Sequence, residues 1–181
     1  MSTDLNNYGA VLYDKKVTFQ KEVPKVSQVI EFNINFEEVE VLTSELEDLA
    51  IQSGEFSRFK VDPKLNFKFK EMYRTWMDRS VKKQIADRVI AAKDDTGKEA
   101  GFISLSKIGS VGKIGLIAVD KSCRGKKIGT QLLYQADVFF QNSGVSSCEV
   151  VTQLDNFPAC SLYEKNGYFK KRVEYIYHYW K

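Results

Sequence analysis

The stretch Cys123–Leu133, CRGKKIGTQLL, decides the fold because it joins two segments of different periodicity. The segment before it, IGLIAV (114–119), is apolar and β-branched, which is typical of a buried strand. The segment after it, QLLYQADVFFQ (131–141), has apolar residues at helical spacing. A helix N-terminus leaves backbone N–H groups unpaired and carries partial positive charge, so it attracts phosphate-like anions. The stretch therefore predicts an anion site at a strand–turn–helix junction.

The elements around this junction indicate a mixed sheet. Three strand-like segments with glycine-containing turns between them predict an antiparallel meander: 87–95, 98–109 and 112–120. The elements expected after the turn are a helix (130–142), a strand (146–154), a helix from Asn156 and strands around YFKKR and EYIYHYW. A strand, a helix and a strand in this order require a right-handed parallel crossover. Parallel and antiparallel pairs are therefore expected in one sheet.

The first half of the chain contains two predicted helices. Apolar residues recur at helical spacing in two sets, of which Gly54 ends the first: Val39, Leu42, Leu46, Leu49 and Ala50, then Phe69, Met72, Tyr73, Trp76 and Ser80. Short strands are predicted before them in YGAVLY (8–13), KVTFQ (16–20) and SQVIEFNI (27–34). We expect residues 1–35 to form N-terminal strands or an extension, and residues 36–181 to form the main domain.

Composition excludes several classes of protein. The 181 residues, 43% hydrophobic and 28% charged, are ordinary values for one globular domain. The N-terminus has no signal-like segment and no apolar run approaches the roughly 20 residues of a membrane helix, so we expect a cytoplasmic protein without a membrane partner. Three cysteines without Cys-x-x-Cys spacing favour free thiols, and a single histidine excludes a two-histidine metal site, so no metal is expected. A net charge of +3 is too small for a dedicated nucleic-acid binder.

The turn fits neither of two common phosphate loops. Thr130 stands where the pattern GxxxxGK[ST] requires lysine, and GxGxxG requires a third glycine. The turn instead resembles motif A of the GCN5-related N-acetyltransferases (GNAT), with Arg124 and Gly129 matching and Lys127 in place of a glycine. DNFPACSLYEKNGY (155–168) resembles the helix that follows in that family, on the positions Asn156, Ala159, Leu162, Tyr163, Gly167 and Tyr168. The resemblance implies the α/β GNAT fold, with six or seven strands and about four helices, and acetyl-CoA as the cofactor.

The same resemblance implies which residues form the site. In this family the turn holds the pyrophosphate of coenzyme A, and the preceding strand hydrogen-bonds its pantetheine and thioester. The implied cofactor-binding residues are Ile117, Ala118, Val119, Arg124, Gly125, Lys126, Lys127, Ile128, Gly129, Thr130, Asn156 and Lys165. Because Lys127 lacks the freedom of glycine, we expect its φ to stay near the helical value. The alternative interpretation of the turn is a solvated basic loop.

Two groups are implied to act in catalysis. The N–H of Ile117 would stabilise the oxyanion, and Tyr163 would be the general acid that meets the departing thiolate. Proton transfer from a tyrosine of pKa ~10 to the thiolate of a thiol of pKa ~8.5 is unfavourable by roughly 2 kcal/mol of free energy. We therefore expect a strong hydrogen bond with late proton movement. The alternative for Tyr163 is simple packing at the edge of a helix.

The acceptor is indicated by SGEFSRFKVDP (53–63). Residues 50–181 resemble the TDP-fucosamine acetyltransferases, which implies acetylation of a nucleotide-linked aminodideoxy sugar such as dTDP-4-amino-4,6-dideoxygalactose for surface polysaccharide synthesis. Arg58, with Lys60, would pair with the diphosphate, and Phe56 or Phe59 would lie against thymine or the sugar. Glu55 is a candidate base, although relay through water would serve equally well.

Three alternatives remain open from the sequence. The acceptor is a protein or polyamine amine in the first, and the chain is a non-catalytic coenzyme A-binding module in the second. The third concerns assembly, because the aromatic run EYIYHYW (174–180) suits either a homodimer interface or core packing.

Overall fold

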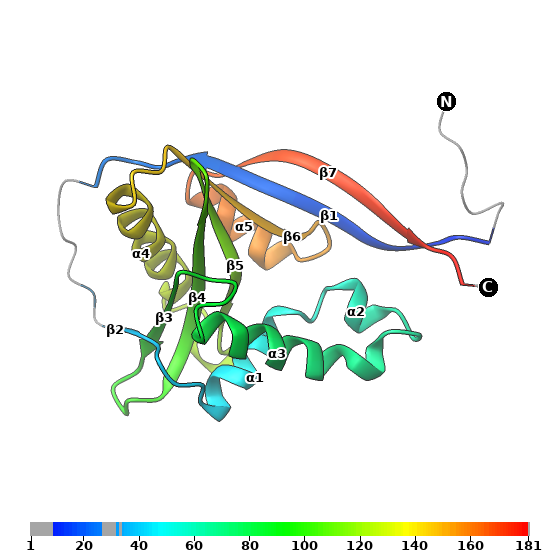
Figure 1. Cartoon of the computed structure of the whole chain (residues 1–181), viewed down its shortest axis with the longest axis horizontal. Coiled ribbons are helices and arrows are strands. Elements are labelled where there is room, and N and C mark those ends of the chain that lie inside the picture. Colours follow the sequence, from blue (N-terminus) through cyan, green and yellow to red (C-terminus); the bar gives the residue numbers. More distant parts are fainter. Residues whose placement is uncertain (1–8, 27–31, 33, 181) are drawn as a thin grey trace.

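A mixed sheet forms the framework of the molecule (Figure 1). The computed structural model describes residues 9–26, 32 and 34–180, and within them the sheet has seven strands in the order β2-β3-β4-β5-β6-β1-β7. Its strands are β1 (Val11–Glu22), β2 (Asn35–Glu38), β3 (Arg88–Lys93), β4 (Glu99–Ile108), β5 (Val111–Val119), β6 (Ser147–Gln153) and β7 (Phe169–His178). Strands β5 and β6 pair in parallel, and the other neighbours pair antiparallel. The mixed sheet predicted from the sequence is confirmed.

Five helices cover the two faces of the sheet in the described part of the chain. They are α1 (Ser44–Ser53), α2 (Arg58–Val61), α3 (Phe69–Val81), α4 (Ile128–Asn142) and α5 (Phe157–Lys165). Helices α4 and α5 lie on one face, and α1 and α3 lie on the other (Figure 1). Each face has its own buried cluster, one around Leu132, Leu133 and Phe140 and the other around Leu46 and Met77. No helix within the described residues is both long and apolar enough to cross a membrane.

Most predicted elements are confirmed, with shifted ends. The meander, β6, α3 and α5 occur where the periodicity placed them. Helix α1 begins later than the apolar spacing indicates, because Thr43 caps it by accepting a hydrogen bond from the Leu46 N–H at 3.2 Å. Val39 and Leu42 therefore precede the helix, although Val39 is buried against it.

Strands at the two ends of the chain are longer than predicted. The predicted strands at 8–13 and 16–20 form the single strand β1, and the two predicted C-terminal strands form β7. Pairing between β1 and β7 continues through polar residues at a register shift between Leu12 and Asp14, which the hydrophobic pattern alone does not reveal. The predicted strand at 27–34 lies mostly outside the described residues.

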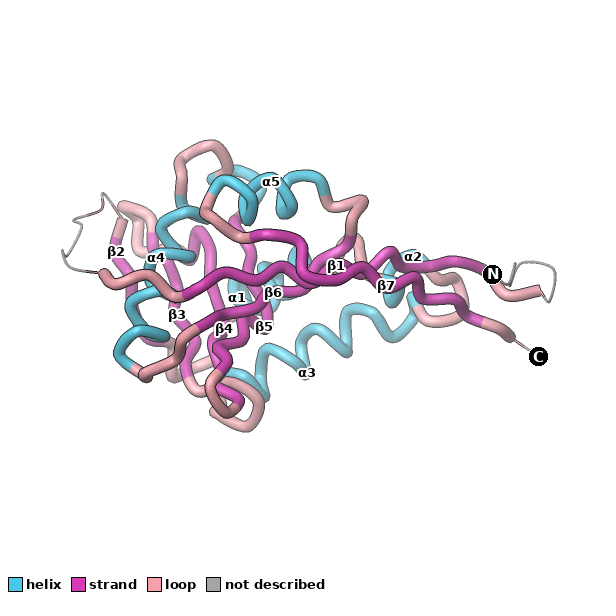
Figure 2. Tube along the Cα trace, turned by 90° about the horizontal axis from the view of Figure 1, so that it is seen from above, coloured by secondary structure: helices cyan, strands magenta, loops and turns pink. Residues whose placement is uncertain are grey.

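Strand β1 is inserted between β6 and β7. It pairs with β6 from Lys16↔Gln153 to Glu22↔Ser147 and with β7 from Val11↔His178 to Gln20↔Phe169. N-terminal to Lys16, β1 has only β7 as its partner, so the two strands extend as a ribbon beside α2 (Figures 1 and 2). The ribbon brings the first described strand close to the loop that precedes α2.

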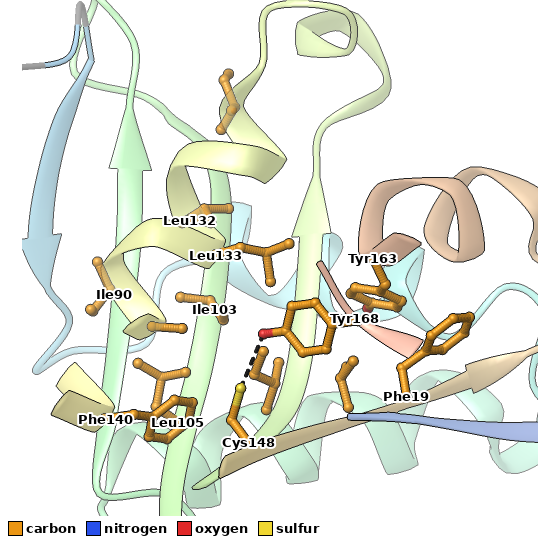
Figure 3. Packing of buried hydrophobic residues seen from close by; sticks show 14 of the residues in the cluster. Phe19, Ile90, Ile103, Leu105, Leu132, Leu133, Phe140, Cys148, Tyr163 and Tyr168 are labelled. Atoms are coloured by element: carbon orange, nitrogen blue, oxygen red, sulfur yellow. Dashed lines mark hydrogen bonds between the residues drawn. The ribbon is translucent and has the colours of Figure 1, made fainter. Parts of the chain in front are cut away.

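A buried ion pair ties β1 to α4. Lys21 Nζ lies 2.7 Å from Asp137 Oδ2, and both side chains are about nine-tenths buried. Burial raises the pKa of the Asp137 carboxyl, and the hydrogen bond and charge of Lys21 oppose that shift. Lys21 also lies over the ring of Tyr168, whose hydroxyl accepts a hydrogen bond from the Cys148 thiol at 3.3 Å (Figure 3). Removal of one partner of such a pair typically costs about 3–5 kcal/mol because the other charge stays buried without a partner, so β1 and α4 each require the residue on the other.

Candidate active site

The central feature of the site is a separation between β5 and β6. Their parallel pairing runs from Val111↔Ser147 to Ile114↔Val150 and then stops, whereas β5 continues to Val119 along β4. A bulge lies at the separation, where Ser104 of β4 accepts a hydrogen bond from the Leu116 N–H through its Oγ at 2.8 Å. The last five residues of β5 therefore have a neighbouring strand on one side only.

Backbone groups of Ile117 and Val119 face the open side. The N–H of Leu116 points to β4, and so does the N–H of Asp120, which donates to the Ala100 carbonyl at 2.8 Å. Because backbone polar groups alternate between the two sides of a strand, those of Ile117 and Val119 point away from β4. The Val119 carbonyl accepts a long hydrogen bond from Arg124 Nε at 3.4 Å. An extended ligand has backbone donors and acceptors available along this edge.

The turn between β5 and α4 is closed by Asp120. Its carboxylate accepts hydrogen bonds from the N–H and the hydroxyl of Ser122 and from Gln52 Nε2. These bonds lower the pKa of the Asp120 carboxyl to about 2. Gly125 follows with φ +82, and no atom lies within 4 Å of the position that its Cβ would occupy. The turn is therefore open on the outer side of Gly125.

The expectation for Lys127 was wrong. Its φ is +62 and its ψ is 12, which is the left-handed conformation, and it forms the N-cap of α4. The physical reason is the geometry of the turn, which reaches the first turn of α4 only through a residue of positive φ. A side chain at such a φ is strained by about 1–2 kcal/mol, and glycine is the residue that avoids this strain.

The N-terminus of α4 packs against α5. A Cβ on Gly129 would lie 3.0 Å from a methyl carbon of Leu162, so this glycine allows the close approach of the two helices. Thr130 is exposed and its Oγ1 accepts a hydrogen bond from Asn166 at 3.4 Å. Ile128 is buried below the turn, whereas Lys126 in the turn and Lys165 in the last turn of α5 are exposed. An anion at this N-terminus would have Lys126 nearby.

Helix α5 carries Asn156 and Tyr163. Asn156 caps the helix, and its side chain accepts a hydrogen bond from the Ala159 N–H at 3.3 Å. Tyr163 is 2% exposed and packs its ring against Phe19 and Tyr168, with centroid distances of 5.4 and 5.7 Å (Figure 3). Burial raises the pKa of Tyr163 strongly, so its hydroxyl stays protonated. The ring is part of the core, and its catalytic role stays a prediction.

The predicted acceptor residues occupy the loop between α1 and α2. Glu55 forms an exposed ion pair with Lys121 at 3.0 Å, and Phe56 is 41% exposed. Arg58 does not extend freely into solvent, since its guanidinium lies 3.6 Å from Asp14 and 4.5 Å from the centroid of the Phe59 ring. The structure therefore places Glu55 beside the end of β5 and Arg58 beside β1.

Sequence reasoning missed Asp14 and Ser57. Both are buried, and their signal was weak, because Asp14 is one carboxylate in an alternating polar strand and Ser57 is an ordinary loop residue. His178, the single histidine of the chain, contacts the buried Asp62 at 2.5 Å, and Trp180 donates to the same carboxylate. Across residues 9–26, 32 and 34–180, no group of three or more His, Cys, Asp or Glu residues is arranged to hold a metal ion.

Comparison with known proteins relates the chain to acetyltransferases. The model of the acetyltransferase (GNAT) family matches residues 45–168. Among solved structures, PH1933 from Pyrococcus horikoshii OT3 has 26% identity and a TM-score of 0.62, covering 80% of this chain and 94% of that one. A PaiA N-acetyltransferase from Thermoplasma acidophilum, in complex with coenzyme A, has 21% identity and a TM-score of 0.56, covering 74% and 89%.

A longer relative is also similar. The GCN5-related N-acetyltransferase from Sphaerobacter thermophilus has 16% identity and a TM-score of 0.61, covering 96% of this chain and 53% of that one, so the present chain spans about half its length. No curated protein matches the chain.

Proposed function

The chain belongs to the acetyltransferase (GNAT) family, and on that premise we propose that it transfers an acetyl group from acetyl-CoA to the amino group of a nucleotide-linked aminodideoxy sugar such as dTDP-4-amino-4,6-dideoxygalactose. The observation that carries the acetyl-transfer part is the separation of β5 from β6 beside the N-terminus of α4. The open edge of β5 offers backbone hydrogen bonds, and the N-terminus of α4 offers a site for an anion.

The residues present suit coenzyme A. The open edge at Ile117 and Val119 matches the need of an extended chain for backbone partners, and the open turn at Gly125 leaves room for a diphosphate at the N-terminus of α4. Ala118, Arg124, Lys126 and Lys165 complete the proposed contacts. The bound cofactor supplies an activated acetyl thioester, and the outward N–H of Ile117 would stabilise negative charge that develops on the acyl oxygen.

Tyr163 would act as a neutral hydrogen-bond donor to the departing sulfur. Its raised pKa disfavours early proton transfer, because the thiolate is a weaker base than the buried phenolate. The same burial keeps the proton on the hydroxyl at every working pH. We therefore assign late proton movement to this step.

The sugar nucleotide is supported by charge near the acceptor loop. Residues 54–70 contain five basic and two acidic residues, so this segment has a net charge of +3, equal to that of the whole chain. Lys60, Lys64, Lys68 and Lys70 are all exposed, and Lys68 is paired with Glu71 at 2.7 Å. A basic segment beside the acceptor loop favours a diphosphate-bearing substrate over a polyamine, which would be repelled.

Thiol release tests the proposal. Purified protein with acetyl-CoA is expected to release free thiol with dTDP-4-amino-4,6-dideoxygalactose, and mass spectrometry should find the N-acetylated product. Spermidine and a peptide with a free N-terminus serve as competing acceptors. A preference for either of them would replace the sugar with a polyamine or protein acceptor, and no release with any amine would favour a non-catalytic coenzyme A-binding module.

Two variants sharpen the result. Tyr163→Phe is expected to lower kcat about 100-fold while the Kd for coenzyme A stays within about twofold, because general acid catalysis is typically worth 10²–10⁴-fold. The double variant Lys60→Ala, Lys64→Ala should raise KM for the sugar nucleotide about tenfold. Its matched control is Lys82→Ala, Lys83→Ala at the other end of α3, which should leave KM unchanged.

A further inference from the structure

Two buried oxygen atoms near the acceptor loop have no hydrogen-bond partner among the described residues. Asp14 is 3% exposed and Ser57 is 5% exposed, yet neither Asp14 Oδ1 nor Ser57 Oγ has a partner in good hydrogen-bond geometry, although Gln153 lies beside Asp14 and the Tyr73 hydroxyl beside Ser57. Buried polar atoms without partners are rare, because each costs about 1–3 kcal/mol. Six such atoms occur among the described residues, and these two are the ones that lie in neighbouring segments beside the acceptor loop, where a ligand group can complete their hydrogen bonding.

Asp14 lies just beyond the end of β6. Pairing of β1 with β6 ends at Lys16↔Gln153, and the carbonyl of Lys15 accepts a hydrogen bond from the Leu154 N–H at 2.9 Å. The chain then continues from Leu154 into the connection that leads to α5. Asp14 is therefore positioned at the β6 side of the separation between β5 and β6.

The loop between α1 and α2 crosses from the β5 side to Asp14. At its start, Gln52 Nε2 donates to Asp120 at 3.2 Å and Glu55 pairs with Lys121, so this part lies at the end of β5. Four residues after Gly54, Arg58 lies 3.6 Å from Asp14 Oδ2. Ser57 is between these two anchors. The loop thus spans the separation, with the two unpaired oxygen atoms on its β6 side.

We propose that Asp14 Oδ1 and Ser57 Oγ bind the primary amino group of the acceptor, and that Asp14 takes its proton. An N–H bond of the ammonium breaks and an O–H bond forms on Asp14, which leaves the lone pair on nitrogen. That pair forms the C–N bond of the amide while the C–S bond breaks, and the sulfur leaves with its electron pair and takes the proton of the Tyr163 hydroxyl. The nitrogen loses its second proton, which replaces the one that Tyr163 gives up, and Asp14 releases the first proton to water. The inference rests on amine acetylation and holds for any primary amine.

The surroundings of Asp14 suit a base. The charged and titratable groups that face it are Arg58 from α2, Lys16 from β1 and Tyr73 from α3. Burial raises the pKa of the Asp14 carboxyl, and the charge of Arg58 offsets only part of that shift. A carboxylate with a raised pKa is a stronger base than an exposed one, which brings it closer to the pKa that suits proton transfer near neutral pH.

Asp14→Asn tests the role directly. The variant is expected to lower kcat/KM for the amine about 100-fold, with the Kd for acetyl-CoA unchanged. Wild-type kcat/KM should rise with pH as Asp14 ionises, whereas the rate of the variant should follow only the fraction of unprotonated amine and recover at alkaline pH. Ser57→Ala, which removes one oxygen from the site, should raise KM for the amine about tenfold. This variant tests the site if Asp14→Asn does not fold.

Asp62→Asn is the matched control. Asp62 is also a buried carboxylate, but both of its oxygens are occupied, Oδ1 by the Lys64 N–H and Oδ2 by His178 and Trp180. This variant should lose stability but keep the rise of kcat/KM with pH that the ionisation of Asp14 causes. If both variants lost that rise, general loosening of the fold would explain the loss, and the inference would be overturned.

The choice of amines separates this inference from the proposed function. The acceptors are dTDP-4-amino-4,6-dideoxygalactose and two small primary amines, glucosamine and 2-aminoethanol, at high concentration. Turnover of a small amine but not of the sugar nucleotide, with a defect in Asp14→Asn, overturns the sugar assignment and supports Asp14. If Asp14→Asn keeps its turnover and its pH profile is unchanged, the role of Asp14 is overturned and the proposed function is not. Absence of turnover with every amine overturns both.

Discussion

Replacement of Lys127 by glycine is expected to stabilise the free protein. Lys127 has φ +62 directly before α4, and its exposed side chain makes no hydrogen bond or ion pair with the described residues. The substitution therefore removes backbone strain without removing a stabilising contact. The left-handed conformation is retained, because glycine adopts it freely.

The expected magnitude is the difference between two effects. Strain at a left-handed lysine is about 1–2 kcal/mol, whereas glycine adds unfolded-state entropy equivalent to about 0.4–1 kcal/mol. The net gain therefore lies between about 0 and 1.6 kcal/mol, with a midpoint of about 0.8 kcal/mol. For a chain of this size, the midpoint gain raises Tm by about 2–3 °C.

Two control variants isolate the strain. Lys126 is the neighbouring exposed lysine, and its φ is not positive. Lys126→Gly should therefore lose about 0.4–1 kcal/mol from the entropy of the unfolded chain alone. The difference between the two glycine variants equals the strain of Lys127, about 1–2 kcal/mol. Lys127→Ala removes the charge but keeps the strain, so it should give no gain.

Urea unfolding of the three variants, followed by circular dichroism without cofactor, measures these differences. Equal destabilisation by Lys127→Gly and Lys126→Gly would show that Lys127 is not strained and would refute the reasoning. A gain in Lys127→Ala equal to that in Lys127→Gly would instead attribute the effect to charge.

Three further predictions concern stability. Lys21→Ala leaves the buried Asp137 carboxylate without its partner, so calorimetry should show a loss of about 3–5 kcal/mol, and a loss below 1 kcal/mol would contradict the importance of the pair. Gly54→Ala places a Cβ 2.2 Å from Tyr73 Cζ, so urea unfolding should show a loss of about 1–3 kcal/mol, whereas Gly97→Ala would test only a positive φ in open space. Asp120 has a pKa lowered from 3.8 to about 2, so its contribution to stability is complete above pH 3.8 and disappears as the pH falls toward 2. The stability difference between the wild type and Asp120→Asn should therefore shrink across that range, by less than about 1 kcal/mol because solvent reaches part of the carboxylate. A difference that grows there would contradict the hydrogen bonding of Asp120.

Local signals predicted the elements that surround the site. The meander, the strand–turn–helix junction and the capped helix at Asn156 depend on periodicity, glycine-containing turns and a capping side chain, all of which act over a few residues. The ends were less accurate where a cap competed with apolar spacing, as Thr43 does at the start of α1. The left-handed φ of Lys127 was missed because glycine, not lysine, is the residue whose presence in a sequence indicates a positive φ.

The acceptor side of the site depends on contacts between distant parts of the chain. Arg58, for which a role toward a diphosphate stays a prediction, lies beside Asp14, a contact that arises because the β1–β7 ribbon extends beside α2. No pattern in residues 9–22 distinguishes an inserted central strand from an edge strand, since both alternate in polarity.

The amino-acid sequence by itself determined the order of the elements from α3 to β7, the turn that opens α4 and the family to which the chain belongs. These features depend on interactions among residues close together in the chain, so they leave a readable pattern. Tertiary structure alone decided the insertion of β1 between β6 and β7, the buried Lys21–Asp137 pair formed across 116 positions, and the meeting of Asp14 with the acceptor loop. Such contacts result from packing of the whole sheet and have no local signature.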